Sequence, residues 1–316
     1  MNILSTAKLP EQIKEELLHT YPRMTFHFHS KMEEALPYLK DAEILLTYGE
    51  DLNEELIDQA TALKWIMVLS AGMDEMPFPC IKERNILVTN SRGIHQIPMA
   101  EYAISMLLQV NRQAKTLIEN QRNHVWDRRV NMTEISGSTM TIVGSGAIGQ
   151  ELARLAKAFR MKTIGISRSG QAKEYFDEVY PSTEIHKALP EADFVVSILP
   201  STQETHYFYQ TEHFQHMKES AIFLNMGRGD AVRSEVLLEA LKTDQIAHAV
   251  LDVTDPEPLP TNHPLWDQPN VTITPHLSGK SVHYLPRAIA IFKHNLNVYL
   301  DGKGTYENEI DPDRGY

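Results

Sequence analysis

Cysteine is almost missing from this chain: Cys80 is the single example among 316 residues. A lone cysteine excludes an intrachain disulfide and favours a reducing compartment. No catalytic signature surrounds it, so we expect a structural thiol. Blocks of lysine and arginine are missing as well, and the formal net charge is −12. This acidic balance argues against nucleic acid and anionic membrane surfaces as partners.

Long apolar runs are also absent. No stretch is long enough to span a membrane, and residues 1–5 lead directly into a strand-like run instead of the charged and apolar regions of a signal peptide. Hydrophobic residues make up 42% of the chain and charged residues 23%, which is ordinary for a globular protein. The length suffices for two domains. We therefore expect a soluble, cytoplasmic protein.

Two series of alternating β-prone and helical segments account for most of the chain. In the first series the expected strands cover 2–5, 24–29, 43–47, 65–69 and 86–89, and the expected helical segments cover 11–19, 31–38, 53–60 and 81–84. In the second series strands are expected at 140–143, 163–167, 194–198, 221–225, 247–253 and 271–274, with the clearest helices at 150–159 and 234–241. Such alternation predicts an α/β fold, with helices on both faces of parallel, doubly wound sheets.

Longer helical segments link the two series. A helix is expected from residue 97, where apolar residues repeat at helical spacing and form one stripe that we assign to core packing. The members of this stripe are Met99, Tyr102, Ala103, Met106, Leu107 and Val110. The helix fades into the polar run 119–124, which we interpret as a connector. The last helical run, 282–300, is long enough to return to the first domain, and the acidic segment 307–313 is expected to be a solvated end.

The clearest motif is the glycine-rich sequence GSGAIG at 144–149, which follows a β-prone run and precedes a helix-forming segment. This order of strand, glycine turn and helix is the context in which G-x-G-x-x-G predicts dinucleotide binding. Gly144 permits a tight turn, and Gly146 lets the backbone approach a pyrophosphate. Gly149 lets the helix pack close to the strand, so that the amides of its first residues, Ala147 and Ile148, face the phosphates.

The residues after the next strand bear on the choice of dinucleotide. An acidic residue usually stands about twenty positions past the glycines and binds the ribose 2′-hydroxyl. Here the strand is followed by Ser167, Arg168 and Ser169, without a carboxylate. A carboxylate would repel a 2′-phosphate, whereas an arginine between two hydroxyls can bind one. We therefore favour NADP(H), with NAD(H) as the alternative; the competing interpretation is an exposed loop arginine.

Three later segments place polar side chains at expected strand ends, the edge at which open α/β sheets bind ligands. Arg228 lies between two glycines, Glu257 lies in a proline-rich segment, and His276 follows the last strand. A nicotinamide enzyme that reduces a ketone needs a proton donor and a substrate clamp. Histidine has the pKa range of such a donor, a glutamate can orient it, and arginine suits a carboxylate. Sequence order alone does not bring these three residues together.

These motifs make the chain resemble the D-isomer-specific 2-hydroxyacid dehydrogenase family, and closely its glyoxylate/hydroxypyruvate reductase-like branch. The resemblance runs essentially end to end. Besides the glycine turn it rests on NMGRG at 225–229, LDV at 251–253, EPLP at 257–260, HPLW at 263–266 and TPH at 274–276. It implies an oxidoreductase that transfers a hydride between a nicotinamide and C2 of a small 2-oxo acid or D-2-hydroxy acid.

The resemblance also implies roles for individual residues. Arg228 anchors the 2-oxo acid, His276 is the general acid/base, and Glu257 pairs with it. Asp252 contacts the nicotinamide carboxamide. Further cofactor contacts are implied at Leu199, Pro200, Met226, His276 and Ser278, and a substrate loop at Ser70, Ala71 and Gly72. Hydride transfer needs no metal, so none is expected.

At the level of the whole chain, the resemblance implies a homodimer whose subunits have two Rossmann-like domains with a cleft between them. A flavodoxin-like, discontinuous substrate domain comprises 1–96 and 285–316, and the dinucleotide-binding domain comprises 97–284. The sequence Ser167-Arg168-Ser169, where many members carry aspartate, favours the NADP-using branch. The alternatives are a phosphoglycerate or phosphite dehydrogenase-like enzyme and, outside catalysis, a nucleotide-sensing corepressor-like protein.

Overall fold

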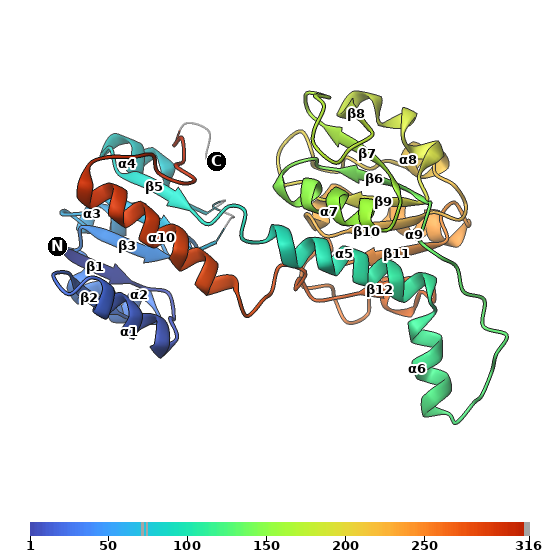
Figure 1. Cartoon of the computed structure of the whole chain (residues 1–316), viewed down its shortest axis with the longest axis horizontal. Coiled ribbons are helices and arrows are strands. Elements are labelled where there is room, and N and C mark those ends of the chain that lie inside the picture. The colour runs from blue at the N-terminus through green and yellow to red at the C-terminus, as the bar shows by residue number, and fades with distance from the viewer. Residues whose placement is uncertain (71–72, 74, 313–316) are drawn as a thin grey trace. The chain divides into compact units, whose positions relative to one another are not determined.

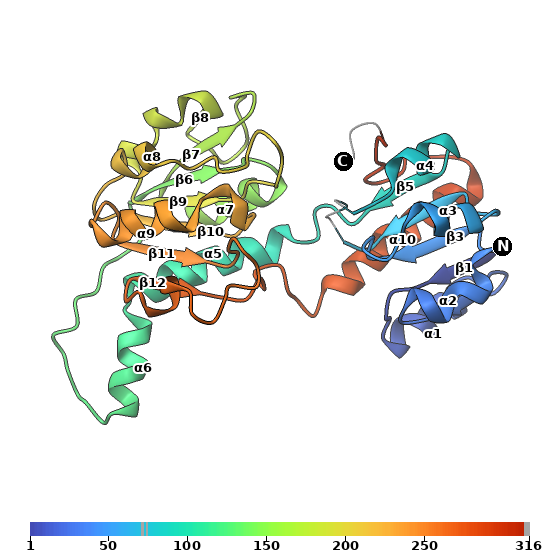
Figure 2. The same cartoon turned by 180° about the vertical axis from the view of Figure 1, so that it is seen from behind.

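The computed structural model describes residues 1–70, 73 and 75–312. Its chain forms two compact units (Figures 1 and 2). The first unit combines Met1–Ile94 with Ser281–Tyr316, and the second comprises His95–Lys280. The first unit therefore contains segments from both ends of the chain.

The first unit is built on a parallel sheet in the order β2-β1-β3-β4-β5, a flavodoxin-like order. Its strands are β1 (Asn2–Ser5), β2 (Thr25–Phe28), β3 (Ile44–Thr47), β4 (Trp65–Val68) and β5 (Leu87–Asn90). Its helices are α1 (Glu11–Thr20), α2 (Met32–Leu39), α3 (Glu54–Gln59), α4 (Phe78–Glu83) and α10 (Tyr284–Asp301). The central strands β3 and β4 are buried throughout and apolar except for Thr47, as expected of parallel strands covered on both faces.

Each face of this sheet carries its own core. Leu17 of α1 and Phe292 of α10 are buried in one core, where Phe292 stacks on Trp65 of β4 at 5.4 Å between ring centroids. Leu39 of α2 and Ile57 of α3 are buried in the other core. Helix α10 thus packs on the sheet formed by the N-terminal block.

The segment after α10 differs from the solvated end expected from its acidic composition. The Ile310 amide donates to Val88 O at 2.9 Å, Asn308 Nδ2 donates to Asn90 O at 3.2 Å, and Glu309 forms a bridge with Thr89. Ile310 is buried in a core of the unit. The expectation is wrong for 308–310, because β5 is an edge strand whose backbone groups need partners and Ile310 gains from burial.

The second unit contains a parallel sheet in the order β12-β11-β10-β9-β6-β7-β8. The strands are β6 (Thr139–Val143), β7 (Lys162–Ser167), β8 (Glu178–Pro181), β9 (Phe194–Ser197), β10 (Ile222–Asn225), β11 (His248–Leu251) and β12 (Val271–Ile273). The α-helices are α5 (Gln96–Asn111), α6 (Ala114–Arg122), α7 (Ala147–Ala158), α8 (Thr211–Gln215) and α9 (Ser234–Lys242), and 3₁₀ turns cover Ser182–Lys187, Leu189–Glu191, Gly229–Ala231 and Pro264–Asp267. Two parallel sheets, each with its helices, confirm the predicted α/β fold.

Two elements of this unit differ from the sequence-based expectation. Strand β8 is not among the expected strands, and all its residues are half-buried at the edge of the sheet. The connector after α5 is partly a second helix: Gln113, with φ 55°, ends the first helix, and α6 follows. Helix α6 has no buried residue, so its polar sequence lacks the apolar stripe by which helices are recognised.

Candidate active site

The glycine turn joins β6 to α7 with geometry that excludes side chains at two positions. Gly144 has φ +111°, and a Cβ there would lie 2.9 Å from Ile198 O. A Cβ on Gly149 would lie 2.3 Å from Gly144 O. Both glycines are therefore required by the backbone itself, the first for the turn and the third for close packing of helix on strand.

The middle glycine of the motif differs from the other two. A Cβ on Gly146 would meet no protein atom within 4 Å, so its backbone faces open space. Gly146 also caps α7, where the described structure has no side-chain hydrogen bond to the first amides. The amides of Ala147 and Ile148 belong to the first helical turn, whose N–H groups lack partners within the helix. An approachable backbone and unpaired helical amides suit a pyrophosphate.

The end of β7 places Arg168 on the surface. Its Nη2 atom lies 3.2 Å from Glu204 Oε2, and the two side chains are 73% and 70% exposed. Ser167 Oγ accepts a hydrogen bond from Gly170 N at 3.1 Å, which shapes the turn after the strand. Ser169 Oγ accepts from Gln171 N at 3.4 Å. The guanidinium and both hydroxyls thus lie in one short turn.

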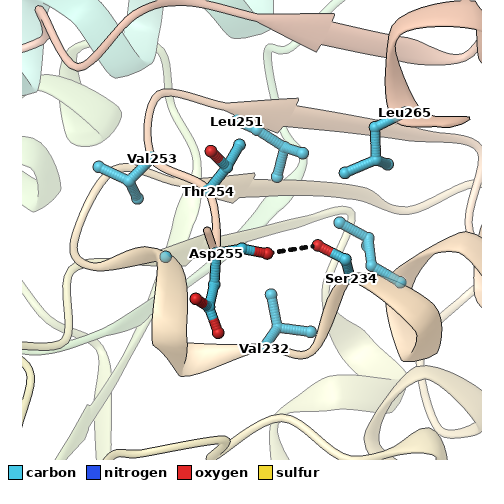
Figure 3. A pocket seen from close by; sticks show the side chains of 9 residues that line it. Val232, Ser234, Leu251, Val253, Thr254, Asp255 and Leu265 are labelled. Carbon is cyan, nitrogen blue, oxygen red and sulfur yellow. Dashed lines mark hydrogen bonds between the residues drawn. The ribbon is translucent and has the colours of Figure 1, made fainter. Parts of the chain in front are cut away.

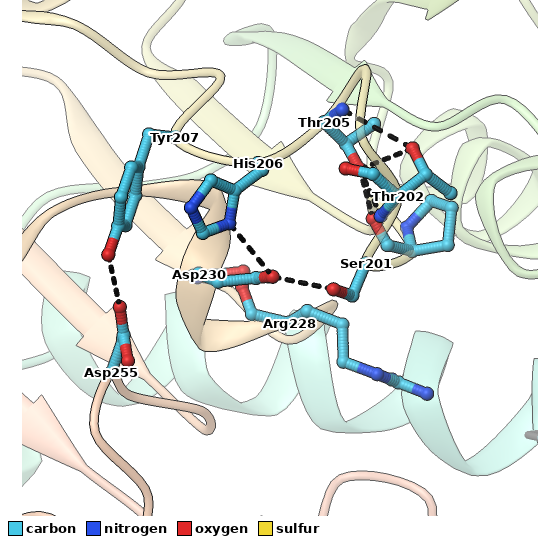
Figure 4. Close-up of polar contacts among 10 residues, drawn as sticks. Ser201, Thr202, Thr205, His206, Tyr207, Arg228, Asp230 and Asp255 are labelled. Carbon is cyan, nitrogen blue, oxygen red and sulfur yellow. Dashed lines mark hydrogen bonds and ion pairs between the residues drawn. The ribbon is translucent and has the colours of Figure 1, made fainter. Parts of the chain in front are cut away.

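The loop after β9 is tied to the loop after β10 through one carboxylate (Figure 4). Ser201 Oγ donates to Asp230 Oδ2 at 2.5 Å, and His206 Nδ1 lies 3.4 Å from the same oxygen. Leu199 and Pro200 directly precede Ser201, so this tether holds the segment for which the resemblance implies cofactor contacts. Sequence reasoning missed Asp230, because no motif links it to Ser201.

Arg228 lies in a backbone segment that is closely packed on both sides. A Cβ on Gly227 would lie 2.4 Å from Leu199 O, and one on Gly229 would lie 1.9 Å from Thr254 O. The guanidinium Nη1 donates to Gly227 O at 3.0 Å and, in Figure 4, points away from Asp230 and His206. It forms no ion pair with Glu257 in the part of the chain that the structure describes. Met226, the preceding residue, is buried.

Glu257 and His276 are brought together although nineteen positions separate them. His276 Nδ1 lies 2.7 Å from Glu257 Oε1, and their side chains are 51% and 41% exposed. The short distance identifies Nδ1–H as the donor to the carboxylate, which leaves Nε2 to exchange a proton with a ligand. The structure thus supplies an oriented, accessible imidazole.

Asp252, which follows β11, is buried and fully engaged with the His276 segment. Its Oδ1 accepts from Leu277 N and its Oδ2 accepts from Ser278 N, both at 2.9 Å. The sequence singled out Asp252 and Ser278 as cofactor contacts. The structure adds a bond between them that the sequence did not indicate.

The remaining predicted substrate residues belong to the first unit. Ser70 Oγ donates to Tyr48 O at 2.9 Å. Ala71 and Gly72 lie outside the described residues.

The end of β4 is also held by a residue of α10. The Tyr284 hydroxyl donates to Leu69 O at 2.8 Å, and burial raises the pKa of Tyr284 to about 12.

A small pocket is lined by residues that follow β10 and β11 (Figure 3). Its lining includes Gly229, Val253 and Asp255, and Ser234 Oγ donates to Asp255 O at 2.9 Å. Its volume is about 10 Å³, which leaves room for about one water molecule. This pocket is therefore too small for a substrate or cofactor.

The fold and the glycine turn together define a nucleotide-binding α/β protein. The oriented histidine at its strand ends is a group that can exchange a proton with a substrate. The family model for the D-isomer specific 2-hydroxyacid dehydrogenase NAD binding domain matches residues 104–278. The chain belongs to this family, and it is a nicotinamide-dependent 2-hydroxyacid dehydrogenase or reductase. The described residues include no helix with the length and apolarity needed to cross a membrane.

Relatives agree with this assignment over most of the chain. A glyoxylate reductase/hydroxypyruvate reductase from Mus musculus is 37% identical, over 82% of this chain and 81% of its own. Glyoxylate/hydroxypyruvate reductase B from Escherichia fergusonii is 31% identical, over 95% of each. A D-isomer specific 2-hydroxyacid dehydrogenase family crystal structure from Aeromonas salmonicida has a TM-score of 0.88 at 35% identity, covering 99% of each chain. The predicted resemblance is confirmed.

Proposed function

We propose that the chain is an NADPH-preferring reductase of small 2-oxo acids such as glyoxylate or hydroxypyruvate, giving D-2-hydroxy acids. The observation that carries this proposal is the Glu257–His276 pair, in which Nδ1 and Oε1 lie 2.7 Å apart in the unit that holds the glycine turn. The names of the Mus musculus and Escherichia fergusonii relatives support the substrate class.

The residues of the chain divide the chemistry among them. A bound nicotinamide supplies the hydride for C2 of the oxo acid. His276 gives the proton from Nε2 to the carbonyl oxygen, while Glu257 holds Nδ1–H and stabilises the charged imidazole. Arg228 binds the substrate carboxylate, a contact that suits its planar guanidinium. We assign Ser70, Ala71 and Gly72 of the first unit to the same carboxylate.

The second unit has features that fit the cofactor. The open backbone at Gly146 and the first amides of α7 would hold the pyrophosphate. Leu199, Pro200, Met226, Asp252 and Ser278 are assigned to the nicotinamide side of the same cofactor. We therefore propose 1–96 with 285–316 as the substrate domain and 97–284 as the dinucleotide-binding domain.

The preference for NADPH rests on the turn after β7. Arg168, flanked by the hydroxyls of Ser167 and Ser169, offers a charged partner to a 2′-phosphate and no carboxylate within the turn. We expect Arg168→Asp to raise the KM for NADPH at least tenfold, since a new carboxylate would repel the 2′-phosphate. The KM for NADH should change little. Steady-state kinetics with both cofactors measures this, and a clear NADH preference of the wild-type chain would contradict the proposal.

The defining experiment is an NADPH oxidation assay over a panel of 2-oxo acids. We expect turnover with glyoxylate and hydroxypyruvate, and little with 3-phosphohydroxypyruvate. Preferred turnover of the phosphorylated acid would instead indicate a phosphoglycerate dehydrogenase-like enzyme. Cofactor binding without turnover of any oxo acid would favour the corepressor-like alternative and overturn the proposed function.

A further inference from the structure

A chain of short hydrogen bonds connects α5 to the residue that holds the His276 segment. Tyr102 Oη lies 2.6 Å from Thr274 Oγ1, and Thr274 Oγ1 lies 2.6 Å from Asp252 Oδ1. Tyr102 and Thr274 are 172 positions apart. All three residues belong to the second unit. The tyrosine, which sequence analysis assigned to core packing, therefore also has a polar contact at the site.

The direction of donation along this chain is fixed by its last member. A carboxylate accepts hydrogen bonds and has none to donate, so Thr274 must donate to Asp252. The threonine oxygen then accepts from the Tyr102 hydroxyl. Burial raises the pKa of Tyr102 above its ordinary value, which keeps this hydroxyl protonated as a donor. Aligned hydrogen bonds of this kind polarise one another and strengthen the bond to the carboxylate.

Asp252, at the end of this chain, fixes three consecutive residues. Its main-chain oxygen accepts from His276 N at 2.8 Å, and its two carboxylate oxygens accept from Leu277 N and Ser278 N. His276 has φ 49°, a left-handed conformation that a residue with a side chain adopts only when its surroundings impose it. Asp252 supplies the contacts that impose it.

We propose that Tyr102 is a positioning residue of this enzyme: through Thr274 it orients the Asp252 carboxylate, and through Asp252 it sets the backbone from which the His276 imidazole projects. This inference rests on the proposed function, in which His276 is the proton donor. Tyr102 itself does not touch the substrate. Its effect falls on turnover, because a small displacement of a catalytic group lowers the rate strongly.

The test is a double-mutant cycle in the full-length protein, with glyoxylate and NADPH as substrates. We expect Tyr102→Phe to lower kcat about tenfold with KM for glyoxylate within about twofold of wild type. Thr274→Val removes the bond to Asp252 itself and should lower kcat at least as much. Because Tyr102 acts through Thr274, adding Tyr102→Phe to Thr274→Val should have no further effect. Thr274→Ser keeps the hydroxyl and should retain most of the turnover.

The matched control is Tyr21→Phe in the first unit. It removes a hydroxyl that donates to Asn297 Oδ1 at 3.1 Å, and it should leave kcat unchanged. Additive effects of Tyr102→Phe and Thr274→Val, or a lower melting temperature with unchanged kcat, would overturn the positioning role. If Tyr102→Phe does not fold, equal kcat values for Thr274→Ser and Thr274→Val overturn it. An unchanged Tyr102→Phe enzyme rejects this inference alone, whereas a wild-type chain inactive on every oxo acid rejects the proposed function as well.

Discussion

His276 projects from a backbone segment that Asp252 holds, and Glu257 fixes its ring at 2.7 Å. We expect His276→Ala to lower kcat about 10²–10⁴-fold, the usual contribution of general acid catalysis, and to leave NADPH binding intact. Turnover with glyoxylate and fluorescence titration with NADPH measure the two effects. The exposed His186 provides the control, since His186→Ala should leave both unchanged. Near-normal turnover of His276→Ala would remove histidine from the mechanism.

A second histidine affects stability. His248 Nε2 lies 2.9 Å from Thr272 Oγ1 on the neighbouring strand, and burial together with Lys115 lowers its pKa from 6.5 to about 4. As the pH falls through 6.5, His248 binds a proton in the unfolded chain, whereas in the folded chain it stays neutral down to about pH 4. This residue therefore destabilises the folded state increasingly over that window, by about 2 kcal/mol at pH 5 relative to pH 7.

The variant His248→Gln tests this linkage, because glutamine has hydrogen-bonding groups but does not titrate. Urea unfolding at about pH 7 and about pH 5 should show a stability loss about 2 kcal/mol smaller in the variant than in wild type. His186→Ala again serves as the control. Equal losses in wild type and His248→Gln would contradict the buried, neutral state of this imidazole.

Some residues of the candidate site could be predicted from the sequence and others could not. Glu257 and His276 could be proposed from their motifs, and the structure shows the contact between them. The bonds of Tyr102, Thr274 and Asp252 were hidden, because each depends on how distant segments pack. Tyr102 lies at a position of the apolar stripe of its helix, so the sequence offered no reason to expect a hydrogen bond from its hydroxyl. A polar tip on an aromatic side chain in an otherwise apolar stripe is the feature that could have indicated it.

At the scale of elements, the buried strands and the edge strands β2 and β12 lie within expected segments, whereas strand β8 and the pairing of 308–310 were not predicted. β3, β4, β9 and β10 are buried throughout and lie within expected segments. β8 pairs with the interior strand β7, and the segment 308–310 pairs with the edge strand β5. Both pairings use backbone groups, which no side-chain pattern records. Helix α6 buries no residue and so gives no periodic signal.

The turn after β7 and the loop after β9 meet at one ion pair, which should tune cofactor affinity. A 2′-phosphate must compete with Glu204 for Arg168, 3.2 Å away. Exposed pairs are worth about 0–1 kcal/mol, so Glu204→Gln should lower KM for NADPH about two- to fivefold and leave NADH unchanged. Glu184→Gln, which breaks an exposed pair with Lys187, is the matched control. Equal changes in KM for NADPH and NADH would show that Glu204 does not affect recognition of the 2′-phosphate.

At the scale of the whole molecule, the two parallel sheets follow from the repeated alternation of strands and helices, whereas their strand orders come from the structure. Whether subunits associate cannot be predicted from this alternation. It depends on which apolar side chains the folded chain leaves exposed. In Figure 1, α6 and the segment after it extend away from the rest of the second unit. Four large apolar side chains of this arm are exposed: Leu117 at 40%, Ile118 at 50%, Val125 at 50% and Trp126 at 92%.

We propose that this exposed arm forms the interface of a homodimer, since apolar side chains on a projecting segment mark an interaction surface. We expect Ile118→Glu combined with Trp126→Glu to convert the dimer to a monomer, because each buried charge would lack a partner in the interface. Light scattering after size exclusion measures the mass of each variant. Leu18→Glu, at a 48% exposed position of α1 in the first unit, is the control and should remain dimeric. A monomeric wild-type chain would refute the dimer, and a dimeric double variant would place the interface elsewhere.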